Sequence, residues 1–367
     1  LESMVLSFPN LPLFIFSSSF VGDNKMKKSL KILKSIIFIA LIVFGALELN
    51  NLFIRKSLAK PWDMGNKIGG FFNESDDYNT MFFGTSHSYC SFEPLVIYER
   101  TGIKSYVLAS QSQPLKISAS YIKEALRRKN PKIIFVDIQS SIYKLTEDSS
   151  VINSYSDYMP MSNNKMKMII KKVPKGFKAQ AIFPLVTYHS RWDKLKDEDY
   201  NFDKASYEDY LKGYVLLKGQ SENFKNDQVE DLNKYIASIK SFNEKNYLKE
   251  NLAAIDEIID TANRKDLRLF FVKTPIYDYD LYKDNISYIE RELKNRGANF
   301  IDFNNFYDEM NLSKEDFYDP HHLNVKGAEK FNLFFIDYMK REGIFQENLA
   351  DDKDWLDNIR IYDINKS

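Results

Sequence analysis

The chain has little cysteine, no net charge and few histidines, and each shortage narrows the classes of protein to which it can belong. Cys90 is the only cysteine among 367 residues, which excludes an intrachain disulfide framework and disfavours a cysteine-based zinc site. The 51 lysines and arginines balance 51 aspartates and glutamates. A nucleic-acid-binding surface needs an excess of basic side chains, so we expect no nucleic-acid partner. Histidine occurs four times, so a motif that contains it carries more weight.

The composition supports a large folded core. Hydrophobic residues make up 44% of the chain and aromatic residues 15%, which is enough to bury an extensive core. A single domain rarely grows beyond about 250–300 residues. The 367 residues therefore predict one large domain with insertions or additional segments, and no internal repeat is visible.

An apolar segment near the N-terminus predicts a membrane anchor. Residues 36–54 are mostly apolar, interrupted by Glu48 towards their outer end, and a helix needs about 20 such residues to cross a bilayer. By the positive-inside rule, the lysines that precede the segment stay in the cytoplasm and the residues after it lie outside. We therefore expect a single-pass plasma-membrane protein with an extracytoplasmic body, anchored by residues 26–56. The lysines are Lys27, Lys28, Lys31 and Lys34.

Two alternatives remain open for this segment. Its uncharged part, residues 35–47, is short enough to be the core of a cleaved signal peptide, but no A-x-A-like cleavage site follows it. The other alternative is an amphipathic or buried helix of a soluble protein. Residues 1–25 have neither helical caps nor sustained periodicity, so we interpret them as leader or vector-derived sequence before a true start at Met26.

After residue 78, short apolar runs alternate with helical stripes. The runs predict strands at residues 80–83, 105–109, 132–138, 267–273 and 299–303. Apolar periodicity predicts helices at about 94–99, 115–126, 228–263, 283–296 and 325–341. This alternation is typical of a parallel sheet with right-handed crossovers. The expected fold is α/β: a three-layer α/β/α sandwich with about five parallel strands, preceded by the membrane-anchor helix.

The remaining segments divide the chain further. We expect a linker at 57–77, an α/β domain at 78–343 and a peripheral charged tail at 344–367. Within the domain, residues 140–225 are polar, rich in Lys, Asn, Asp and Tyr, and contain scattered prolines. We interpret this stretch as an insertion of helices and loops.

Two short motifs carry residues suited to chemistry. The first, GTSHS at 84–88, follows the first predicted strand, and its glycine permits a tight turn that exposes Ser86 above the sheet. The second, DPHH at 319–322, precedes the last predicted helix. Ligands bind beyond the carboxyl ends of the strands in an open parallel sheet, so both motifs are expected at that edge. There Asp319 can orient His322, whose other ring nitrogen can take a proton from Ser86.

The joint placement of the two motifs carries the prediction. A G-x-S sequence alone has little value, because a second copy occurs at residues 219–221. A D-x-x-H sequence is rarer in a chain with four histidines. The alternative interpretation is a surface turn in which Asp319 caps a helix beside two exposed histidines.

At these residues the sequence resembles the SGNH/GDSL hydrolase superfamily. Ser86 falls on the family's nucleophile, in G-T-S where many members have G-D-S, and Asp319 and His322 fall on its closing D-x-x-H. The match continues in HLN at 322–324 and GA at 327–328. This continuation is common in the membrane-anchored envelope branch of the superfamily, so the sequence resembles that branch most. The branch contains D-alanyl-lipoteichoic acid transfer proteins and O-acetyltransferase-like proteins.

The resemblance covers about residues 78–339, apart from 140–225. It implies an SGNH/flavodoxin-like fold and a serine esterase or acyltransferase that needs no cofactor and no metal. It further implies an acetyl or D-alanyl group moved on a cell-envelope glycan or teichoic acid, with a membrane-bound O-acyltransferase as a partner. Two alternatives stay open: a wall-polysaccharide deacetylase that only hydrolyses, and a non-catalytic glycan-binding or scaffold module.

Two blocks of the family pattern are not matched, and both concern the groups that bind the oxyanion. After the second predicted strand the family has a glycine, whereas this chain has Ala109 followed by Ser110 and Gln111. A backbone N–H does not require glycine, so the N–H of Ser110 or Gln111 is the candidate donor. After the third strand the family has an asparagine, and Gln139 is the nearest amide here.

Three further residues are candidate substrate contacts. His87 adjoins the nucleophile, with packing beside the site as its alternative role. His189 and Arg191 stand beside Trp192 in the insertion, a group that could grip a sugar or phosphate, with ordinary surface packing as the alternative. A metal shared by His321 and its neighbour is not expected, because adjacent side chains in an extended turn point apart.

Overall fold

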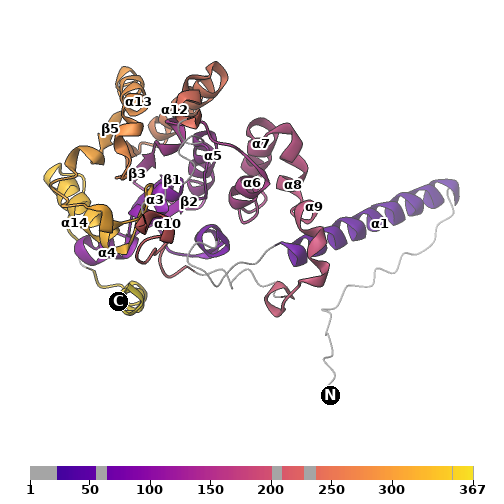
Figure 1. Ribbon diagram of the computed structural model, residues 1–367. Coiled ribbons are helices and arrows are strands. Elements are labelled where there is room, and N and C mark those ends of the chain that lie inside the picture. Colours follow the sequence, from indigo (N-terminus) through magenta and orange to yellow (C-terminus); the bar gives the residue numbers. More distant parts are fainter. Residues whose placement is uncertain (1–22, 55–63, 201–208, 227–236, 349, 367) are drawn as a thin grey trace. The chain divides into compact units, whose positions relative to one another are not determined.

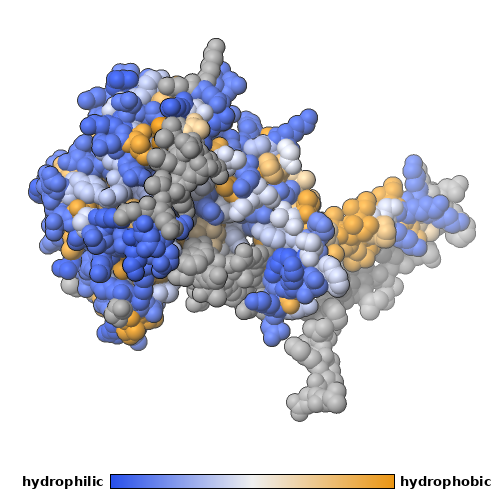
Figure 2. Space-filling view, in the orientation of Figure 1, coloured by the Kyte–Doolittle hydropathy of each residue, from blue (hydrophilic) through white to orange (hydrophobic). Residues whose placement is uncertain are grey.

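The computed structural model begins with one long apolar helix (Figure 1). Helix α1 (Asp23–Phe53) contains a stretch, Met26–Phe53, that is long and apolar enough to cross a membrane, and its apolar side chains are exposed. Figure 2 shows these hydrophobic residues along the helix. Most of the expected leader, residues 1–22, lies outside the described residues. The structure describes residues 23–54, 64–200, 209–226, 237–348 and 350–366.

The body of the protein is built on a five-stranded parallel sheet, as predicted. Its order is β2-β1-β3-β4-β5, and each neighbouring pair is parallel. Because all strands run the same way, their carboxyl ends share one edge. The strands are β1 (Thr80–Gly84), β2 (Ser105–Ala109), β3 (Ile133–Asp137), β4 (Arg268–Lys273) and β5 (Asn299–Asp302).

A ladder of phenylalanines joins the central strands. Phe82 stands opposite Phe135, which stands opposite Phe270, and the ring centroids are 5.2 Å apart in both pairs. Every residue of β1, β2 and β3 is buried, which explains why these strands read as continuous apolar runs. Stacked aromatic pairs add about 0.5–1.5 kcal/mol each beyond the burial of their area.

Helices between and after the strands bury apolar stripes. Leu115, Ala119 and Ile122 of α5 are at most 1% exposed, and α5 packs against α12. The predicted helix at 228–263 is interrupted in the structure. Residues 237–240 are helical, the short turn η7 (Ser241–Asn243) follows, and α12 begins at Lys245; residues 227–236 lie outside the described residues. The main helices are α4 (Pro94–Thr101), α5 (Leu115–Ala125), α12 (Lys245–Arg264), α13 (Lys283–Asn295) and α14 (Val325–Arg341).

The predicted insertion consists of short helices and turns. Helix α8 packs against α6, α7 and α9, and α7 also packs against α5. Residues 201–208 lie outside the described residues. The helices are α6 (Ser149–Ser156), α7 (Asn163–Lys172), α8 (Lys178–Ile182), α9 (Leu185–Tyr188) and α10 (Glu222–Lys225).

The segment expected to be a linker is helical over residues 65–73 and buries several apolar side chains. It forms η1 (Gly65–Gly69) and α2 (Gly70–Asn73), in which Ile68 and Phe71 are fully buried. The ammonium group of Lys67 binds Asp209 at 2.8 Å, a buried ion pair. Apolar burial, rather than flexibility, therefore characterises this part of the chain.

The expectation of a peripheral tail was wrong. Residues 353–366 form α15 (Lys353–Lys366), which packs on α4 and buries Trp355 completely. The indole Nε1 of Trp355 donates to Asp76 Oδ2 at 2.9 Å. Trp355, Ile359 and Tyr362 recur at spacings of four and three, so an apolar face is present within a charged segment.

A buried carboxyl group links α15 to the body. Glu93 precedes α4, and its Oε1 accepts a hydrogen bond from the Tyr362 hydroxyl at 2.8 Å. Burial raises the pKa of Glu93 from its ordinary value of 4.5 to about 8, despite hydrogen bonds from Tyr362 and Tyr214. The folded state therefore holds a proton that the unfolded chain releases. This contribution to stability is fully present below the ordinary pKa and is lost as the pH rises through 8.

We expect the free energy of unfolding to fall more steeply with pH in the wild type than in Glu93→Gln, which needs no proton. From pH 6 to pH 9 the wild type should lose roughly 2–3 kcal/mol more of its free energy of unfolding than Glu93→Gln loses. Urea unfolding at both pH values measures it. Glu99→Gln, at an exposed position of the same helix, is the control and should keep the wild-type slope. Equal slopes in the wild type and Glu93→Gln would contradict the protonation of Glu93.

Candidate active site

The first motif forms the turn between β1 and a short helix at the carboxyl edge of the sheet. Helix α3 (Ser86–Ser91) begins directly after the strand, and Thr85 caps it by accepting a hydrogen bond from the His87 N–H at 3.2 Å. Ser86 thereby occupies the first helical position, where backbone N–H groups have no acceptor inside the helix. The side chain of Ser86 is half-buried at this edge.

Gly84 makes this turn possible. A Cβ at this position would lie 2.1 Å from Ser88 Oγ and 3.0 Å from Asp137 Cβ. No side chain fits there without displacing α3 or the end of β3. The glycine of the motif is therefore required by close packing beside the candidate nucleophile.

The second motif forms a narrow hairpin of β6 (Phe317–Asp319) and β7 (His322–Leu323). Asp319 Oδ1 accepts hydrogen bonds from the backbone N–H groups of His321 and His322 at 2.8 and 2.9 Å. The carboxylate thus closes its own turn. It also brings the imidazole of His322 back towards itself.

The residues after the hairpin hold it in place, which gives a physical reason for the HLN and GA sequences. Asn324 caps α14 by accepting from the N–H groups of Lys326 and Gly327, and its Nδ2 donates to the carbonyl of Glu315 at 2.7 Å. A Cβ on Gly327 would lie 2.1 Å from the carbonyl oxygen of Asp316. The loop before the hairpin can therefore pack directly on the first turn of α14.

The two motifs meet. His322 Nε2 lies 2.7 Å from Ser86 Oγ, across 236 residues of sequence, and His322 Nδ1 lies 2.8 Å from Asp319 Oδ2. The structure thus brings together the three residues that the motifs predicted as nucleophile, base and orienting group. A hydroxyl, an imidazole and a carboxylate in this order can deprotonate the hydroxyl as it attacks an electrophile.

Burial and neighbouring groups shift the pKa values of the residues around His322. Burial alone would raise the pKa of Asp319, but the adjacent His322 and hydrogen bonds from His322 and His321 outweigh burial and lower that pKa, so the carboxylate stays ionised. Burial lowers the pKa of His321 to about 4, and it lowers the pKa of His87 well below its usual range. Both neighbours are therefore neutral, and the imidazolium formed on His322 faces an anion.

His87 lies beside the base and not on the surface. It is 4% exposed, and its ring centroid is 5.1 Å from that of His322. This burial does not fit the predicted substrate contact, because a side chain must be accessible to touch a ligand. His87 instead fits the alternative role of packing next to His322.

A buried lysine that the sequence analysis did not single out lies behind the histidines. Lys273 ends β4, is fully buried and donates from Nζ to the Thr274 carbonyl at 2.6 Å. Burial lowers its pKa, against the opposing effect of Asp137 and Asp302, and its charge in turn depresses the pKa of His87. In the sequence this lysine reads as an ordinary strand end, with no signal of burial.

Tyr89 is a second residue that the sequence analysis missed. Burial raises the pKa of Tyr89, and a hydrogen bond between its hydroxyl and the side chain of Ser86 opposes that rise. Tyr89 stands one helical turn after Ser86 on α3, so its spacing of three residues was the available signal. The candidate nucleophile therefore interacts with two side chains, His322 and Tyr89.

The candidate oxyanion groups follow the strands that flank β1. Ala109 of β2 stands opposite Gly84, so Ser110 follows at the level of the serine turn. The side chain of Ser110 is occupied by Gln113 at 2.9 Å, and Gln111 is exposed. This placement is compatible with the backbone N–H groups of Ser110 and Gln111 as donors, while their side chains are directed elsewhere or solvated.

Gln139 does not present its amide to the surface. It is 1% exposed, and among the described residues its Oε1 has no hydrogen-bond partner. Its backbone N–H is bound at 2.8 Å by Asp137, which also accepts two hydrogen bonds from Thr274 at 3.0 Å and so ties the ends of β3 and β4 together. Direct oxyanion binding by the Gln139 side chain would need this buried amide to move.

The structure does not bring His189 and Arg191 to the site. Both belong to η4 (His189–Asp193), which directly follows α9, and Figure 1 shows α9 in a different part of the body from α3. Arg191 forms a bidentate ion pair with Asp199 at 2.9 and 3.0 Å, and His189 Nδ1 lies 2.9 Å from the Val186 carbonyl. The clustering of these residues in the sequence thus reflects local contacts and not a shared ligand site.

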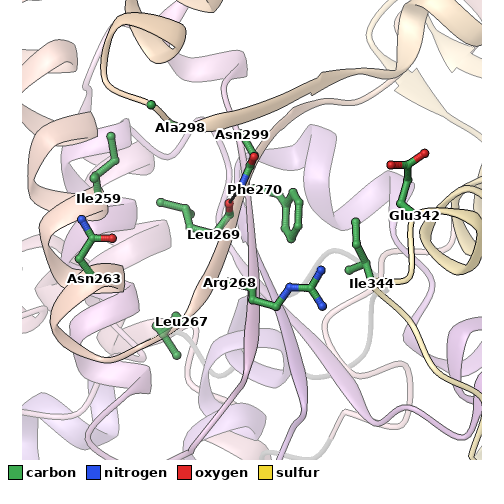
Figure 3. Close-up of a pocket in the computed structure, with 11 residues that line it drawn as sticks. Ile259, Asn263, Leu267, Arg268, Leu269, Phe270, Ala298, Asn299, Glu342 and Ile344 are labelled. Atoms are coloured by element: carbon green, nitrogen blue, oxygen red, sulfur yellow. Dashed lines mark hydrogen bonds between the residues drawn. The ribbon is translucent and has the colours of Figure 1, made fainter.

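Neither a metal nor the pocket shown in Figure 3 offers another candidate centre. The described residues contain no group of three or more His, Cys, Asp or Glu side chains that could hold a metal ion. The pocket of about 400 Å³ is lined by Arg268 and Asn299, which begin β4 and β5, and by Glu342. It therefore lies at the amino-terminal edge of the sheet, opposite Ser86, and its lining contains no hydroxyl or thiol nucleophile.

No protein-family model matches the chain, and no match is found among curated proteins.

We expect Gly84→Ala to displace α3 and with it Ser86. The rate at which a fluorophosphonate labels Ser86 should fall by about 100-fold, because a shift of one ångström costs that much in an organised site. Intact-mass spectrometry over time measures the labelling rate, and circular dichroism checks the fold. Gly176→Ala is the matched control, since a Cβ there meets nothing within 4 Å. An unchanged rate in Gly84→Ala would contradict the role given to Gly84.

Proposed function

We propose that this protein is a serine-dependent esterase or O-acyltransferase of the SGNH/GDSL kind. The observation that carries the proposal is the continuous chain of contacts from Ser86 Oγ to His322 Nε2 at 2.7 Å and from His322 Nδ1 to Asp319 Oδ2 at 2.8 Å. The lowered pKa of Asp319 adds support, because an ionised carboxylate at Nδ1 can orient His322 and stabilise an imidazolium.

In the first half-reaction Ser86 Oγ attacks the carbonyl carbon of an acyl ester while its proton passes to His322 Nε2. Asp319 holds the ring through Nδ1 and stabilises the imidazolium. The tetrahedral intermediate then expels the alcohol, which takes the proton from Nε2, and the acyl group remains on Ser86. In the second half-reaction water or a sugar or polyol hydroxyl gives its proton to Nε2 and attacks the acyl-enzyme. The second tetrahedral intermediate then breaks its bond to Ser86 Oγ, which takes the proton back from Nε2.

The oxyanion of both tetrahedral intermediates needs hydrogen-bond donors. The backbone N–H of Ser86, at the first position of α3, and that of Ser110 or Gln111 are the groups we assign to this task. An N–H pair of this kind contributes through orientation, because the donors are fixed before the charge develops.

The setting of the reaction is part of the proposal. We assign the body to an SGNH/flavodoxin-like three-layer α/β/α sandwich, with α1 as an uncleaved single-pass anchor, its lysines in the cytoplasm and the catalytic domain outside the plasma membrane. The apolar Met26–Phe53 stretch supports the anchor. The substrate would be an acetyl or D-alanyl group on a cell-envelope glycan or teichoic acid, and a membrane-bound O-acyltransferase would supply it. No cofactor is required for this chemistry.

A fluorophosphonate probe should label the protein on Ser86 alone. Ser86→Ala removes the nucleophile and should abolish labelling. Ser221→Ala is the matched control, because Ser221 lies in the second G-x-S sequence and its side chain caps α10. Its contact with the second motif is a backbone hydrogen bond to the Tyr318 carbonyl at 2.7 Å, which the substitution keeps. It should keep the wild-type labelling and lose about 1 kcal/mol of stability from the missing cap.

Labelling that persists in Ser86→Ala would overturn the assignment of the nucleophile. No labelling of the wild type would instead favour the non-catalytic glycan-binding or scaffold module.

With an acetyl ester as donor, we expect the wild type to transfer acetyl to an added oligosaccharide faster than to water. The expected preference comes from a sugar hydroxyl held in the site, which gains over water through proximity and orientation. The buried Gln139 amide, which leaves one oxyanion position unfilled by a side chain, slows both reactions alike. Mass spectrometry of the oligosaccharide and titration of released acetate measure the two products. Acetate release with no acetylated oligosaccharide would favour the deacetylase.

A further inference from the structure

A continuous stretch of the predicted insertion contains basic residues and no acidic residue of its own. Two of its basic side chains, Lys172 and Arg191, form ion pairs with Glu257 and Asp199, which lie outside the stretch. Residues 158–192 contain six lysines and Arg191 and no aspartate or glutamate, in a chain whose total charge is balanced. The rest of the chain carries 44 basic against 51 acidic residues. Such a separation of charge favours contact with an anionic surface rather than simple solubility.

The same stretch exposes large apolar side chains. Ile170 lies on α7, Phe183 precedes α9, Val186 lies in α9, and Trp192 lies in η4. Each is at least 45% exposed, and Trp192 reaches 72%. Figure 2 shows hydrophobic residues at the surface in the region of α8 and α9. Large exposed apolar groups that gather on adjoining elements indicate a surface that is covered in use.

Local contacts make these side chains and the lysines one surface. Lys178 Nζ donates to the Ile170 carbonyl at 2.5 Å, which joins α7 to α8. The Val186 N–H donates to the Phe183 carbonyl at 2.9 Å, so these two residues share one turn. We call this surface the basic apolar face. It consists of Ile170, Phe183, Val186 and Trp192 together with Lys171, Lys175 and Lys178.

A hydrogen bond ties this face to the end of the membrane-spanning stretch. Arg191 Nη1 donates to the carbonyl oxygen of Phe53 at 2.7 Å, and both residues belong to the same compact unit of the chain. Phe53 is the last residue of the apolar stretch Met26–Phe53. In an anchored protein, η4 and its neighbour Trp192 therefore lie where the chain leaves the bilayer.

We propose that the basic apolar face rests on the anionic phospholipid surface of the membrane that α1 spans. Trp192 and Phe183 are side chains that favour the boundary between headgroups and acyl chains. The lysines pair with lipid phosphates, an attraction that salt weakens. The proposal rests on the membrane anchoring in the proposed function. It adds a second attachment that limits how far the catalytic domain tilts away from the bilayer.

The test uses the full chain in lipid nanodiscs and measures tryptophan fluorescence with brominated lipids, which quench only indoles in contact with the acyl region. The emission of Trp192 is obtained by subtracting the tryptophan fluorescence of Trp192→Phe from that of the wild type. In nanodiscs with one third anionic phosphatidylglycerol, we expect brominated lipid to remove at least half of this emission. The triple variant K171Q/K175Q/K178Q and a high salt concentration should each restore most of it.

The matched control K249Q/K265Q/K294Q removes three exposed lysines from other elements and should leave the quenching unchanged. Fluorophosphonate labelling of Ser86 should be equal in all variants, which separates this surface from the catalytic proposal.

Trp192 emission that brominated lipid does not reduce, in a chain that resists extraction by alkaline carbonate, would overturn the lipid contact alone. Emission that changes only when solubilised membrane proteins are added would also overturn it, in favour of a protein partner. Extraction of the chain by carbonate would overturn both the anchor and the lipid contact while leaving Ser86 labelling as the separate test of catalysis.

Discussion

The contact between Ser86 Oγ and His322 Nε2 is the interaction on which the candidate site depends, and two rigid turns hold it across 236 residues. A buried amide stabilises it from behind. Asn332 of α14 accepts from the Glu93 N–H at 3.0 Å and donates to the Ser91 carbonyl at 2.7 Å. The helix that follows the histidine turn is thus bonded directly to the end of the helix that carries the serine. Neither turn can shift without breaking buried hydrogen bonds, which are costly to leave unmade.

Three imidazoles cluster at this point, yet they have different chemical roles. The ring centroid of His322 lies 5.1 Å from that of His87 and 6.4 Å from that of His321. Burial lowers the pKa values of His87 and His321 and keeps both rings uncharged, and the charge of the nearby Lys273 lowers the pKa of His87 further. Among the described residues His322 is the histidine that faces a carboxylate at hydrogen-bond distance. Position relative to Asp319, rather than residue type, therefore determines which ring takes the proton.

The five strands and the three principal site residues could be predicted because local chemistry determines them. Fully buried parallel strands require continuous apolar runs, and a serine after the first strand with a D-x-x-H before the last helix must meet at one sheet edge. Features that depend on contacts between residues far apart in the chain were harder to predict from the sequence. Lys273 carries no mark of burial in its strand, and the grouping of His189 with Arg191 in sequence said nothing about the distance from Ser86. The apolar face of α15 was hidden because charged residues separate Trp355, Ile359 and Tyr362.

The position of Trp355 has a consequence for biogenesis. Its indole binds Asp76, just before β1, and its ring packs against Tyr98 with centroids 4.8 Å apart. The segment before the first strand is therefore sealed by a residue 279 positions further along the chain. During synthesis the body stays incomplete until α15 has left the ribosome. A nascent chain is in an open form until then, and a stop codon before residue 355 would make that form permanent.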